Sequence, residues 1–258
     1  MKFKNILANY AKIKNFLLDI LFPIQCLGCQ KEGTYLCSSC FKTIPLKEKQ
    51  VCPHCQRASL LGKVCPSCKE YSPLDGLLVA SKYENKLLQE LIHNFKYKYI
   101  KELAQPLGKI LVNFLKTQHI YPLEEKQNFK QFIFLPQIFQ EKETIIIPIP
   151  LHRRRLRERG FNQSELLSQE IEKIFNWKIE NQLLIRKYYS KPQIKLSEKE
   201  RKENVKNIFF CPQREKIEGK RIILIDDVVT TGATMNEAAK TLKQAGAKEI
   251  WGLALARG

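Results

Sequence analysis

The chain has 258 residues, a length that accommodates one medium-sized α/β domain together with a small module. Hydrophobic residues make up 44% of it, which is ordinary for a globular protein and argues against wholesale disorder. The formal net charge is +18, from 44 basic and 26 acidic residues. This excess points to a polyanionic partner: nucleic acid, an anionic membrane surface or a highly phosphorylated small molecule. A genome-wide bias toward lysine is the alternative explanation.

Residues 1–22 place apolar side chains at helical spacing with lysines between them. We expect a basic amphipathic helix that packs against its own domain; the alternative is peripheral contact with a membrane surface. Charged residues interrupt the apolar run at Lys12, Lys14 and Asp19, so the segment lacks the core of a signal peptide. With no export signal, the nine cysteines indicate the reducing cytoplasm, where thiols bind metals rather than form disulfides.

The densest metal-binding pattern in the chain follows. Eight cysteines form four C-x-x-C pairs, which are Cys26 and Cys29, Cys37 and Cys40, Cys52 and Cys55, and Cys65 and Cys68. The two-residue gap lets both thiolates of a pair reach one tetrahedral ion, so the pattern predicts two zinc sites of Cys₄ type. Closed shells of this kind are structural rather than catalytic. The spacing leaves open whether the pairs combine sequentially or in a crossed fashion; we favour the sequential combination.

From residue 71 onward the composition is that of an ordinary domain. Residues 77–80 predict a strand, and residues 83–114 predict one or two helices with a periodic apolar face. Residues 116–143 are rich in Gln, Lys and Phe, and we interpret them as an insertion of loop and short helix.

A second apolar strand is expected at residues 144–150, and a basic segment follows it. This segment begins at His152 and contains five arginines, Arg153, Arg154, Arg155, Arg157 and Arg159. Guanidinium groups match the geometry of phosphate oxygens, so a loop here could hold a diphosphate if its strand lies beside the strand at 222–225. A solvated basic loop is the alternative. Residues 162–175 then predict a helix, and the charged run at 185–210 predicts a mobile loop or hairpin.

The most informative stretch is IILIDDVVTTGAT, residues 222–234. Four branched apolar residues predict a strand buried on both faces, and Asp226 and Asp227 lie where it ends. A small hydroxyl-rich turn and a helical pattern follow, and residues 250–256 predict a closing strand. The backbone N–H groups of such a turn bind phosphate, and Gly232 allows close approach of the anion. Two carboxylates beside a phosphate site suit ribose hydroxyls or Mg²⁺, so the predicted ligand is a sugar phosphate.

This stretch resembles the motif by which type I phosphoribosyltransferases bind phosphoribosyl pyrophosphate (PRPP). By that resemblance, Asp226 and Asp227 would hold the ribose hydroxyls, with Mg²⁺ accompanying PRPP, and residues 230–234 would hold the 5-phosphate. The residues implied to bind ribose and phosphate are Asp226, Asp227, Val228, Val229, Thr230, Thr231, Gly232, Ala233 and Thr234. The fold implied is an α/β phosphoribosyltransferase-like parallel sheet flanked by helices.

The cysteine pairs, PLHRRRLRERGFNQSELL, KPQIKLSEKERKENVKNIF and the acidic motif together resemble the ComF family of competence-associated proteins. The resemblance implies a zinc-ribbon module at 26–70 after a helix at 1–25, and a phosphoribosyltransferase-like domain at 71–258 with its insertion near 116–143. It implies a role in DNA uptake on the cytoplasmic side, alongside proteins of the uptake machinery. It also suggests residues 151–155, with His152, Arg153, Arg154 and Arg155, as the pyrophosphate-binding loop, and residues 188–204 as the flexible loop that closes over PRPP.

Two hypotheses for the function follow. In one, the protein binds PRPP and transfers phosphoribosyl to an acceptor that the sequence does not identify. Amidotransferase activity is not expected, because no N-terminal nucleophilic cysteine is present. In the other, it is a non-catalytic accessory that binds single-stranded DNA and uses PRPP as a regulatory ligand. We expect weak, sequence-independent DNA binding through the arginine segment, residues 187–206 and three neighbouring aromatic side chains, Phe161, Tyr188 and Tyr189.

Overall fold

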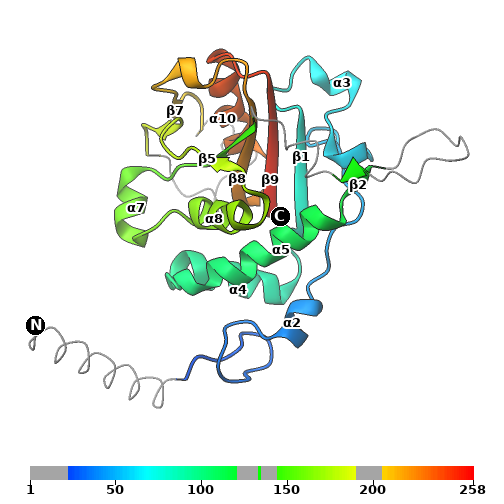
Figure 1. Cartoon of the computed structure of the whole chain (residues 1–258), viewed down its shortest axis with the longest axis vertical. Helices are drawn as coiled ribbons and strands as arrows, with labels where there is room; N and C mark the ends of the chain where they lie inside the picture. Colours follow the sequence, from blue (N-terminus) through cyan, green and yellow to red (C-terminus); the bar gives the residue numbers. More distant parts are fainter. Residues whose placement is uncertain (1–22, 121–132, 135–143, 190–204) are drawn as a thin grey trace, which may run out of the picture. The chain divides into compact units, whose positions relative to one another are not determined.

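The computed structural model describes residues 23–120, 133–134, 144–189 and 205–258 (Figure 1). The chain divides into two compact units, Met1–Ile44 and Pro45–Gly258. Within the described ranges, no helix is long and apolar enough to cross a membrane. The basic helix expected at residues 1–22 lies outside the described residues.

The larger unit is built on a five-stranded sheet in the order β1-β9-β8-β4-β5. All its neighbouring strands are parallel. Its strands are β1 (Gly76–Lys82), β4 (Thr144–Pro148), β5 (Lys178–Ile179), β8 (Arg221–Val229) and β9 (Glu249–Arg257). The expected strands at 77–80, 144–150, 222–225 and 250–256 all lie in it, and the parallel α/β fold is confirmed. Runs of branched apolar residues suit strands that are buried on both faces.

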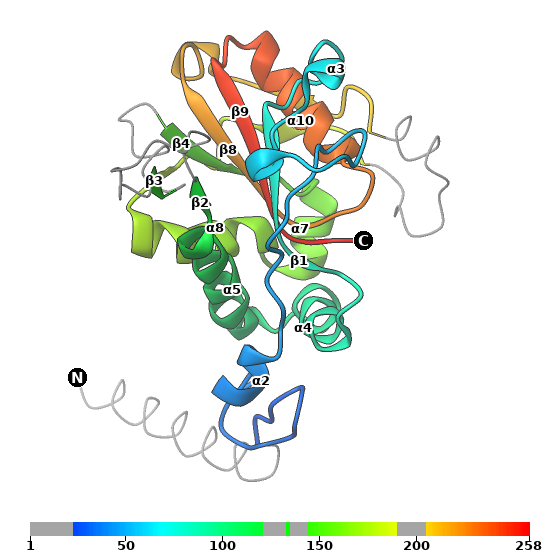
Figure 2. The same ribbon diagram turned by 90° about the vertical axis from the view of Figure 1, so that its right-hand side faces the viewer.

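Helices cover both faces of this sheet. Helices α4 (Lys86–Tyr97), α5 (Ala104–Thr117) and α8 (Gln163–Phe175) pack together on one face, and α10 (Ala233–Gln244) lies on the other (Figure 2). Successive residues of each strand point to opposite faces of the sheet. On one face, Ile145, Ile147, Ile222 and Leu224 pack in one cluster with the apolar side of α10. Ile146 and the other alternates point to the opposite face and are equally buried.

The segment before the second pair of C-x-x-C motifs covers the edge of β1. The Gln50 side-chain amide donates to the Val79 carbonyl at 3.1 Å and accepts the Val79 N–H at 3.0 Å, as a neighbouring strand would. The Lys47 N–H donates to the Ala80 carbonyl at 2.8 Å, and the Ser81 hydroxyl donates to the Pro45 carbonyl at 2.7 Å. The edge strand therefore has its polar backbone groups paired, which protects it from pairing with other chains.

Short elements complete the described chain. In the expected insertion, residues 116 and 117 are the end of α5, and β2 (His119–Ile120) pairs antiparallel with β3 (Ile133–Phe134). Residues 121–132 and 135–143 lie outside the described residues. β6 (Ile185–Arg186) pairs antiparallel with β7 (Phe209–Phe210), so the expected hairpin is confirmed at its two ends. The remaining short helices are α2 (Ser38–Lys42), α3 (Pro66–Lys69), α7 (Arg153–Arg159), η1 (Leu60–Gly62), η2 (Lys101–Leu103) and η4 (Arg214–Lys216).

Candidate functional site

Strand β8 carries two adjacent carboxylates, Asp226 and Asp227, near its carboxyl end. The strand does not stop at these acids as expected but continues to Val229, because Asp226, Val228 and Val229 stay in register with β9. Asp227 is only 2% exposed, and Asp226 is half-buried. Two neighbouring carboxylates in such surroundings require compensation from cations or hydrogen-bond donors.

Lys96 of α4 supplies that compensation to Asp227. Its ammonium lies 2.9 Å from Asp227 Oδ1, which also accepts the Val228 N–H at 2.6 Å. Asp227 Oδ2 is buried and has no hydrogen-bond partner among the described residues. Burial lowers the pKa of Lys96, but the charges of Asp227 and Asp226 outweigh burial and leave that pKa raised. The sequence analysis did not identify Lys96 as a site residue. The one feature that could have pointed to it is its position directly after Phe95, on the buried side of an amphipathic helix.

Asp226 has different partners. Its Oδ1 accepts hydrogen bonds from the Ser164 hydroxyl of α8 at 3.1 Å and from the Asp227 N–H at 2.9 Å. Burial, followed by the charge of Asp227, raises the pKa of Asp226 to about 7 against the lowering effects of Lys96 and these hydrogen bonds. The Asp226 carboxyl therefore changes charge near neutral pH, and a divalent cation or a donor hydroxyl beside it would favour the ionised form.

Residues 230–234 form the turn between β8 and the first residues of α10. Gly232 is the N-cap of α10 and has φ +77°, a left-handed conformation that suits glycine. The Thr231 hydroxyl accepts the Ala233 N–H at 3.3 Å. A small cavity of about 30 Å³ lies here and is lined by Asp226, Val228, Val229, Thr230, Gly232, Ala233, Thr234 and Met235. The first N–H groups of a twelve-residue helix thus border a cavity at the acidic strand end, as the motif predicted.

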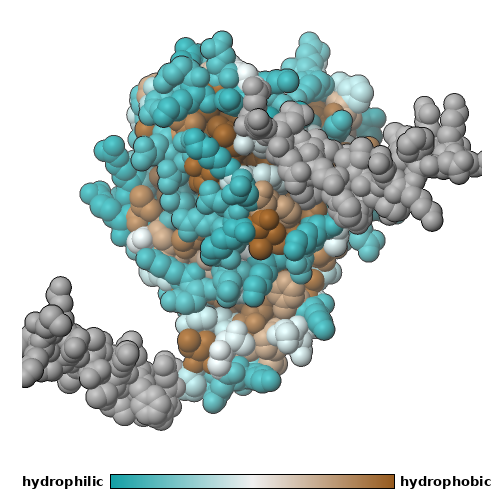
Figure 3. Space-filling model, in the orientation of Figure 1, coloured by the Kyte–Doolittle hydropathy of each residue, from teal (hydrophilic) through white to brown (hydrophobic). Residues whose placement is uncertain are grey.

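The arginine segment after β4 is a helix, α7, and the expectation of a loop is wrong. His152 caps it by accepting the Arg154 N–H at 3.2 Å, and Gly160 ends it with φ +79°. Arg154 Nε donates to Glu158 at 3.0 Å, one turn later. Arginine favours helix, and these three local features outweigh the loop expectation. Hydrophilic side chains cover much of the face of the molecule that Figure 3 shows, with smaller hydrophobic patches between them.

Three of the four expected pyrophosphate-binding residues gather around one aromatic ring. The guanidinium carbons of Arg154 and Arg155 lie 5.2 and 5.9 Å from the centre of the Tyr189 ring. The His152 ring meets Tyr189 edge-on at 5.5 Å. Burial is the main cause that lowers the pKa of Arg186 of β6 to about 10. The charge of Arg155 lowers this pKa further, and the charge of Asp226 raises it. The residues after β4 and the hairpin that starts at β6 thus bring basic groups toward the acidic end of β8.

Arg159, the last of the five arginines expected to bind DNA, also lies near the acidic pair. It donates to Gln163 and lies 5.9 Å from the centre of the Tyr97 ring. Burial lowers its pKa, and the charge of Asp227 acts in the opposite direction. Arg159, Arg186 and Lys96 all come from outside the acidic motif, so only the fold could bring them to it.

The expectation that Phe161 contributes to DNA binding is wrong. Phe161 is 6% exposed, packs against Phe95 in a tilted arrangement with ring centres 5.3 Å apart, and has the Lys101 ammonium over its ring. It is therefore a core residue that no nucleic-acid base can reach. Tyr188 and Tyr189 are 63% and 41% exposed and keep faces open to solvent.

The eight paired cysteines form two groups in sequential order. The first cysteine group is Cys26, Cys29, Cys37 and Cys40, and the second is Cys52, Cys55, Cys65 and Cys68. Within each group all sulfur atoms lie within 4.8 Å of one another. Four thiolates bound tetrahedrally to one Zn²⁺ would lie about 3.8 Å apart, so both groups fit a closed Cys₄ site. His54 is in neither group; its Nε2 lies 2.7 Å from the Ser72 hydroxyl.

Neighbouring groups support the sulfur atoms as metal ligands. In the first group the Cys37 N–H points to Cys26 Sγ at 3.3 Å, and the Cys40 N–H points to Cys37 Sγ at 3.4 Å. In the second group the backbone and side chain of Arg57 lower the pKa of Cys55 to about 6. Donors aimed at sulfur stabilise thiolates, the form that binds zinc.

Comparisons with known proteins agree with both parts. A phosphoribosyl transferase domain model matches residues 163–257, and a double zinc ribbon domain model matches residues 17–70. Competence protein F of Haemophilus influenzae is 31% identical over 248 residues, which cover 91% of this chain and 98% of that protein. DNA utilization protein YhgH of Escherichia coli is 29% identical over 234 residues, with 84% and 95% covered. Competence protein ComFC of Bacillus subtilis is 27% identical over 222 residues, with 84% and 81% covered.

Proposed function

The chain belongs to the family of competence protein F, and we propose that it binds PRPP with Mg²⁺ and acts in DNA uptake during natural transformation. The observation that carries the proposal is the junction of β8 and α10, where a carboxylate pair lies next to a small turn at a helix N-terminus, with basic residues nearby. We place the protein in the cytoplasm, where a reducing environment keeps its cysteines available for zinc.

Each part of PRPP has a counterpart at this junction. The turn at residues 230–234 would hold the 5-phosphate through backbone N–H groups, and Asp226 would accept hydrogen bonds from the ribose hydroxyls. Arg154, Arg155 and Arg186 would bind the diphosphate, since guanidinium groups pair with phosphate oxygens in two-point fashion. Asp227 is already engaged by Lys96, so its role would be to hold Lys96 and the strand end in place. Mg²⁺ would supply neutralising charge to the diphosphate.

If PRPP is turned over, the bond from C1 of the ribose to the diphosphate oxygen breaks while a bond from C1 to an acceptor forms. The basic side chains would stabilise the charge that develops on the departing diphosphate. The hydroxyl contacts of Asp226 would keep the ribose oriented during that displacement.

Calorimetry with PRPP and Mg²⁺ tests the site. We expect Asp226→Asn to weaken binding at least tenfold, because an amide offers a weaker acceptor and no charge. Asp75→Asn is the matched control: Asp75 lies directly before β1, at the amino end of the strands, and accepts the Ile250 N–H at 2.7 Å. Equal PRPP affinity in wild type and Asp226→Asn would refute the assignment.

A second candidate function is a PRPP-regulated accessory without turnover. The ion pair of Lys96 and Asp227 favours it, because this contact leaves one of the two acids committed to the protein itself. Incubation with PRPP, Mg²⁺ and a panel of bases and amines, followed by a pyrophosphate assay, separates the two. Release with one acceptor supports the transferase, and no release above background across the panel supports the accessory.

Single-stranded DNA is the second partner in this proposal. The exposed arginines of α7, with Tyr188 and Tyr189, offer phosphate contacts and stacking faces. We expect weak, sequence-independent binding that falls steeply with salt, because each phosphate contact releases a counterion. Proteins of the uptake machinery are further proposed partners.

Filter binding across a salt series tests the DNA surface. The variant Arg153→Glu/Arg157→Glu should abolish most binding. The matched control, Lys109→Glu/Lys116→Glu on the exposed side of α5, changes the net charge equally and should retain binding. PRPP with Mg²⁺ should weaken DNA binding if the sites overlap. Affinity that is indifferent to salt, or equal loss in both variants, would contradict the assignment to α7.

A further inference from the structure

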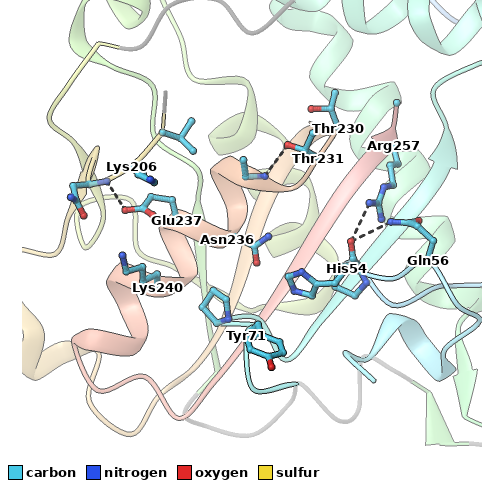
Figure 4. Close-up of a pocket in the computed structure, with 16 residues that line it drawn as sticks. His54, Gln56, Tyr71, Lys206, Thr230, Thr231, Asn236, Glu237, Lys240 and Arg257 are labelled. Carbon is cyan, nitrogen blue, oxygen red and sulfur yellow. Dashed lines mark hydrogen bonds between the residues drawn. The ribbon is translucent and has the colours of Figure 1, made fainter. Parts of the chain in front are cut away.

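A large pocket lies on the far side of the phosphate turn, between α10 and the second cysteine group. Its volume is about 730 Å³, within the range of pockets that bind small molecules. Its walls come from several segments. One side is formed by Pro53, His54 and Gln56 inside the second cysteine group with Tyr71 and Pro73, and the other by the outer side of α10 and residues 205–207; the turn after β8 and the end of β9 complete the lining. Figure 4 shows His54 and Tyr71 facing α10 across the pocket.

This pocket is distinct from the space proposed for PRPP. Thr230 and Ala233 line both it and the small cavity of the turn, so the two spaces share one wall. Asp226 lines only the small cavity, and neither aspartate of the pair is among the described residues that line the large pocket. A ribose held by Asp226 would therefore lie on the other side of the turn.

The charges of the pocket favour an anion. Among the described lining residues, Lys206, Lys240 and Arg257 are basic, and Glu237 is the one carboxylate. Glu237 is engaged: it accepts the Asn207 N–H at 2.7 Å. Arg257 donates to the Pro53 carbonyl at 3.2 Å, which fixes its guanidinium at the pocket wall. The net positive lining makes the pocket receptive to phosphate.

The remaining lining side chains suit a flat, hydrogen-bonding group. Tyr71 is 78% exposed, beside Pro73, and offers its ring face to the pocket. The His54 ring is oriented by the Ser72 hydroxyl at 2.7 Å. Across from them Asn236 points into the pocket, and its Oδ1 is buried with no hydrogen-bond partner among the described residues (Figure 4). A buried acceptor without a partner is costly, and a turn of the Asn236 amide toward the pocket would let a ligand N–H group satisfy it.

We propose that this pocket binds a nucleotide, with the base between Tyr71, His54 and Asn236 and the phosphate near Lys240. Stacking faces, a buried amide oxygen for base N–H groups and surrounding cations are the features by which proteins hold nucleotide units. The nucleotide is either free or the end of a DNA strand, because both present the same chemistry. This site goes beyond the PRPP-binding function and does not depend on it.

Calorimetry on the full-length, zinc-loaded protein tests the proposal with deoxynucleoside monophosphates as probes and ribose 5-phosphate as the ligand without a base. We expect the nucleotides to bind at least tenfold more tightly than ribose 5-phosphate. Lys240→Glu and Tyr71→Ala, both at exposed side chains, should each weaken nucleotide binding at least fivefold. Lys109→Glu on α5 is the matched control and should leave it unchanged.

Two further measurements test where the nucleotide binds and whether it is a free nucleotide or the end of a DNA strand. PRPP with Mg²⁺ should bind alongside the nucleotide, and Asp226→Asn should not affect nucleotide affinity. A 5′-phosphorylated trinucleotide that binds more tightly than the monophosphate identifies strand ends as the source, and the reverse order identifies free nucleotides. No nucleotide binding, complete displacement by PRPP, or binding that Lys240→Glu and Tyr71→Ala leave intact would each overturn the proposal. Because PRPP affinity is measured separately, failure here is distinct from failure of the PRPP site.

Discussion

Two aspartates at opposite ends of the parallel strands, Asp226 near the carboxyl end of β8 and Asp75 directly before β1, have pKa values shifted in opposite directions. Burial and the charge of Asp227 raise the pKa of Asp226 from its ordinary 3.8 to about 7. At Asp75, burial is outweighed by Lys69, the Ile250 N–H and Lys243, so its pKa is lowered. The free energy of unfolding therefore depends on pH with opposite sign at the two positions.

This difference predicts how amide variants respond to pH. The contribution of Asp226 is most favourable below pH 4 and is lost as pH rises through about 7, so Asp226→Asn should melt above wild type at pH 8, with the gap closing toward pH 4. Asp75 stabilises the fold above its unfolded-state pKa, so Asp75→Asn should melt below wild type at pH 7, with its deficit shrinking in acid. Thermal melts from pH 4 to 8 measure the Asp226 effect, and melts continued below pH 4 measure the loss of the Asp75 contribution, because the pKa of Asp75 lies below its ordinary 3.8. The same sign in both variants at pH 7 to 8 would contradict the pKa shifts.

The buried pair of Lys96 and Asp227 makes a second prediction. Lys96→Met leaves the Asp227 carboxylate, 2% exposed, without its cation and should cost about 3 kcal/mol in the free energy of unfolding. Adding Asp227→Asn should recover most of that loss, because the uncompensated charge is gone. Denaturant unfolding of Lys96→Met, Asp227→Asn and the double variant measures the interaction free energy between the two side chains. Lys109→Met at an exposed position serves as control, and additive losses would show that the two side chains do not interact.

At the scale of elements, two glycines end or begin helices with nearly the same left-handed conformation. Gly160, φ +79°, follows α7, and Gly232, φ +77°, precedes α10. An added Cβ meets nothing within 4 Å at Gly160 and comes 3.4 Å from the Asn236 amide nitrogen at Gly232. Each Gly→Ala change should therefore cost about 1 kcal/mol, mainly from the backbone. Only Gly232→Ala should also weaken PRPP binding in calorimetry. Equal PRPP affinity in the two variants would contradict the proposal that the turn at residues 230–234 binds the 5-phosphate.

How far each element could be predicted follows from where its determinants lie. Four strands of the sheet, β1, β4, β8 and β9, and helix α8 follow from local apolar periodicity, and the order of residues in the acidic motif predicts the turn after β8. The two-residue strand β5 was not predicted, because it is too short to show a periodic pattern. Helix α7 was not predicted, because a run of arginines is also typical of a phosphate-binding loop. The residues that indicate a helix are its two caps, His152 before it and Gly160 after it. Lys96 and Arg186 could not be predicted, since their role depends on packing between segments far apart in the chain.

At the scale of the whole molecule, the two cysteine groups fall in different compact units. The first lies in Met1–Ile44, and the second lies in Pro45–Gly258 together with the sheet. The second group is tied to the sheet by short contacts: the Val64 N–H donates to the Asp75 carbonyl at 3.0 Å, and Arg257 at the end of β9 donates to the Pro53 carbonyl at 3.2 Å. Zinc at the second group should therefore stabilise the sheet, and zinc at the first should not.

Paired cysteine variants separate these roles. Elemental analysis should find two zinc ions in wild type and one each in Cys26→Ser/Cys29→Ser and Cys52→Ser/Cys55→Ser. Melting of the sheet can be followed by the fluorescence of Trp251, a buried residue of β9. It should be unchanged in the first variant and shift to lower temperature in the second, because metal-binding free energy at such a site is also folding free energy. Equal melting in the two variants would mean that neither zinc ion, or both alike, is coupled to the sheet, contrary to the contacts of Val64 and Arg257.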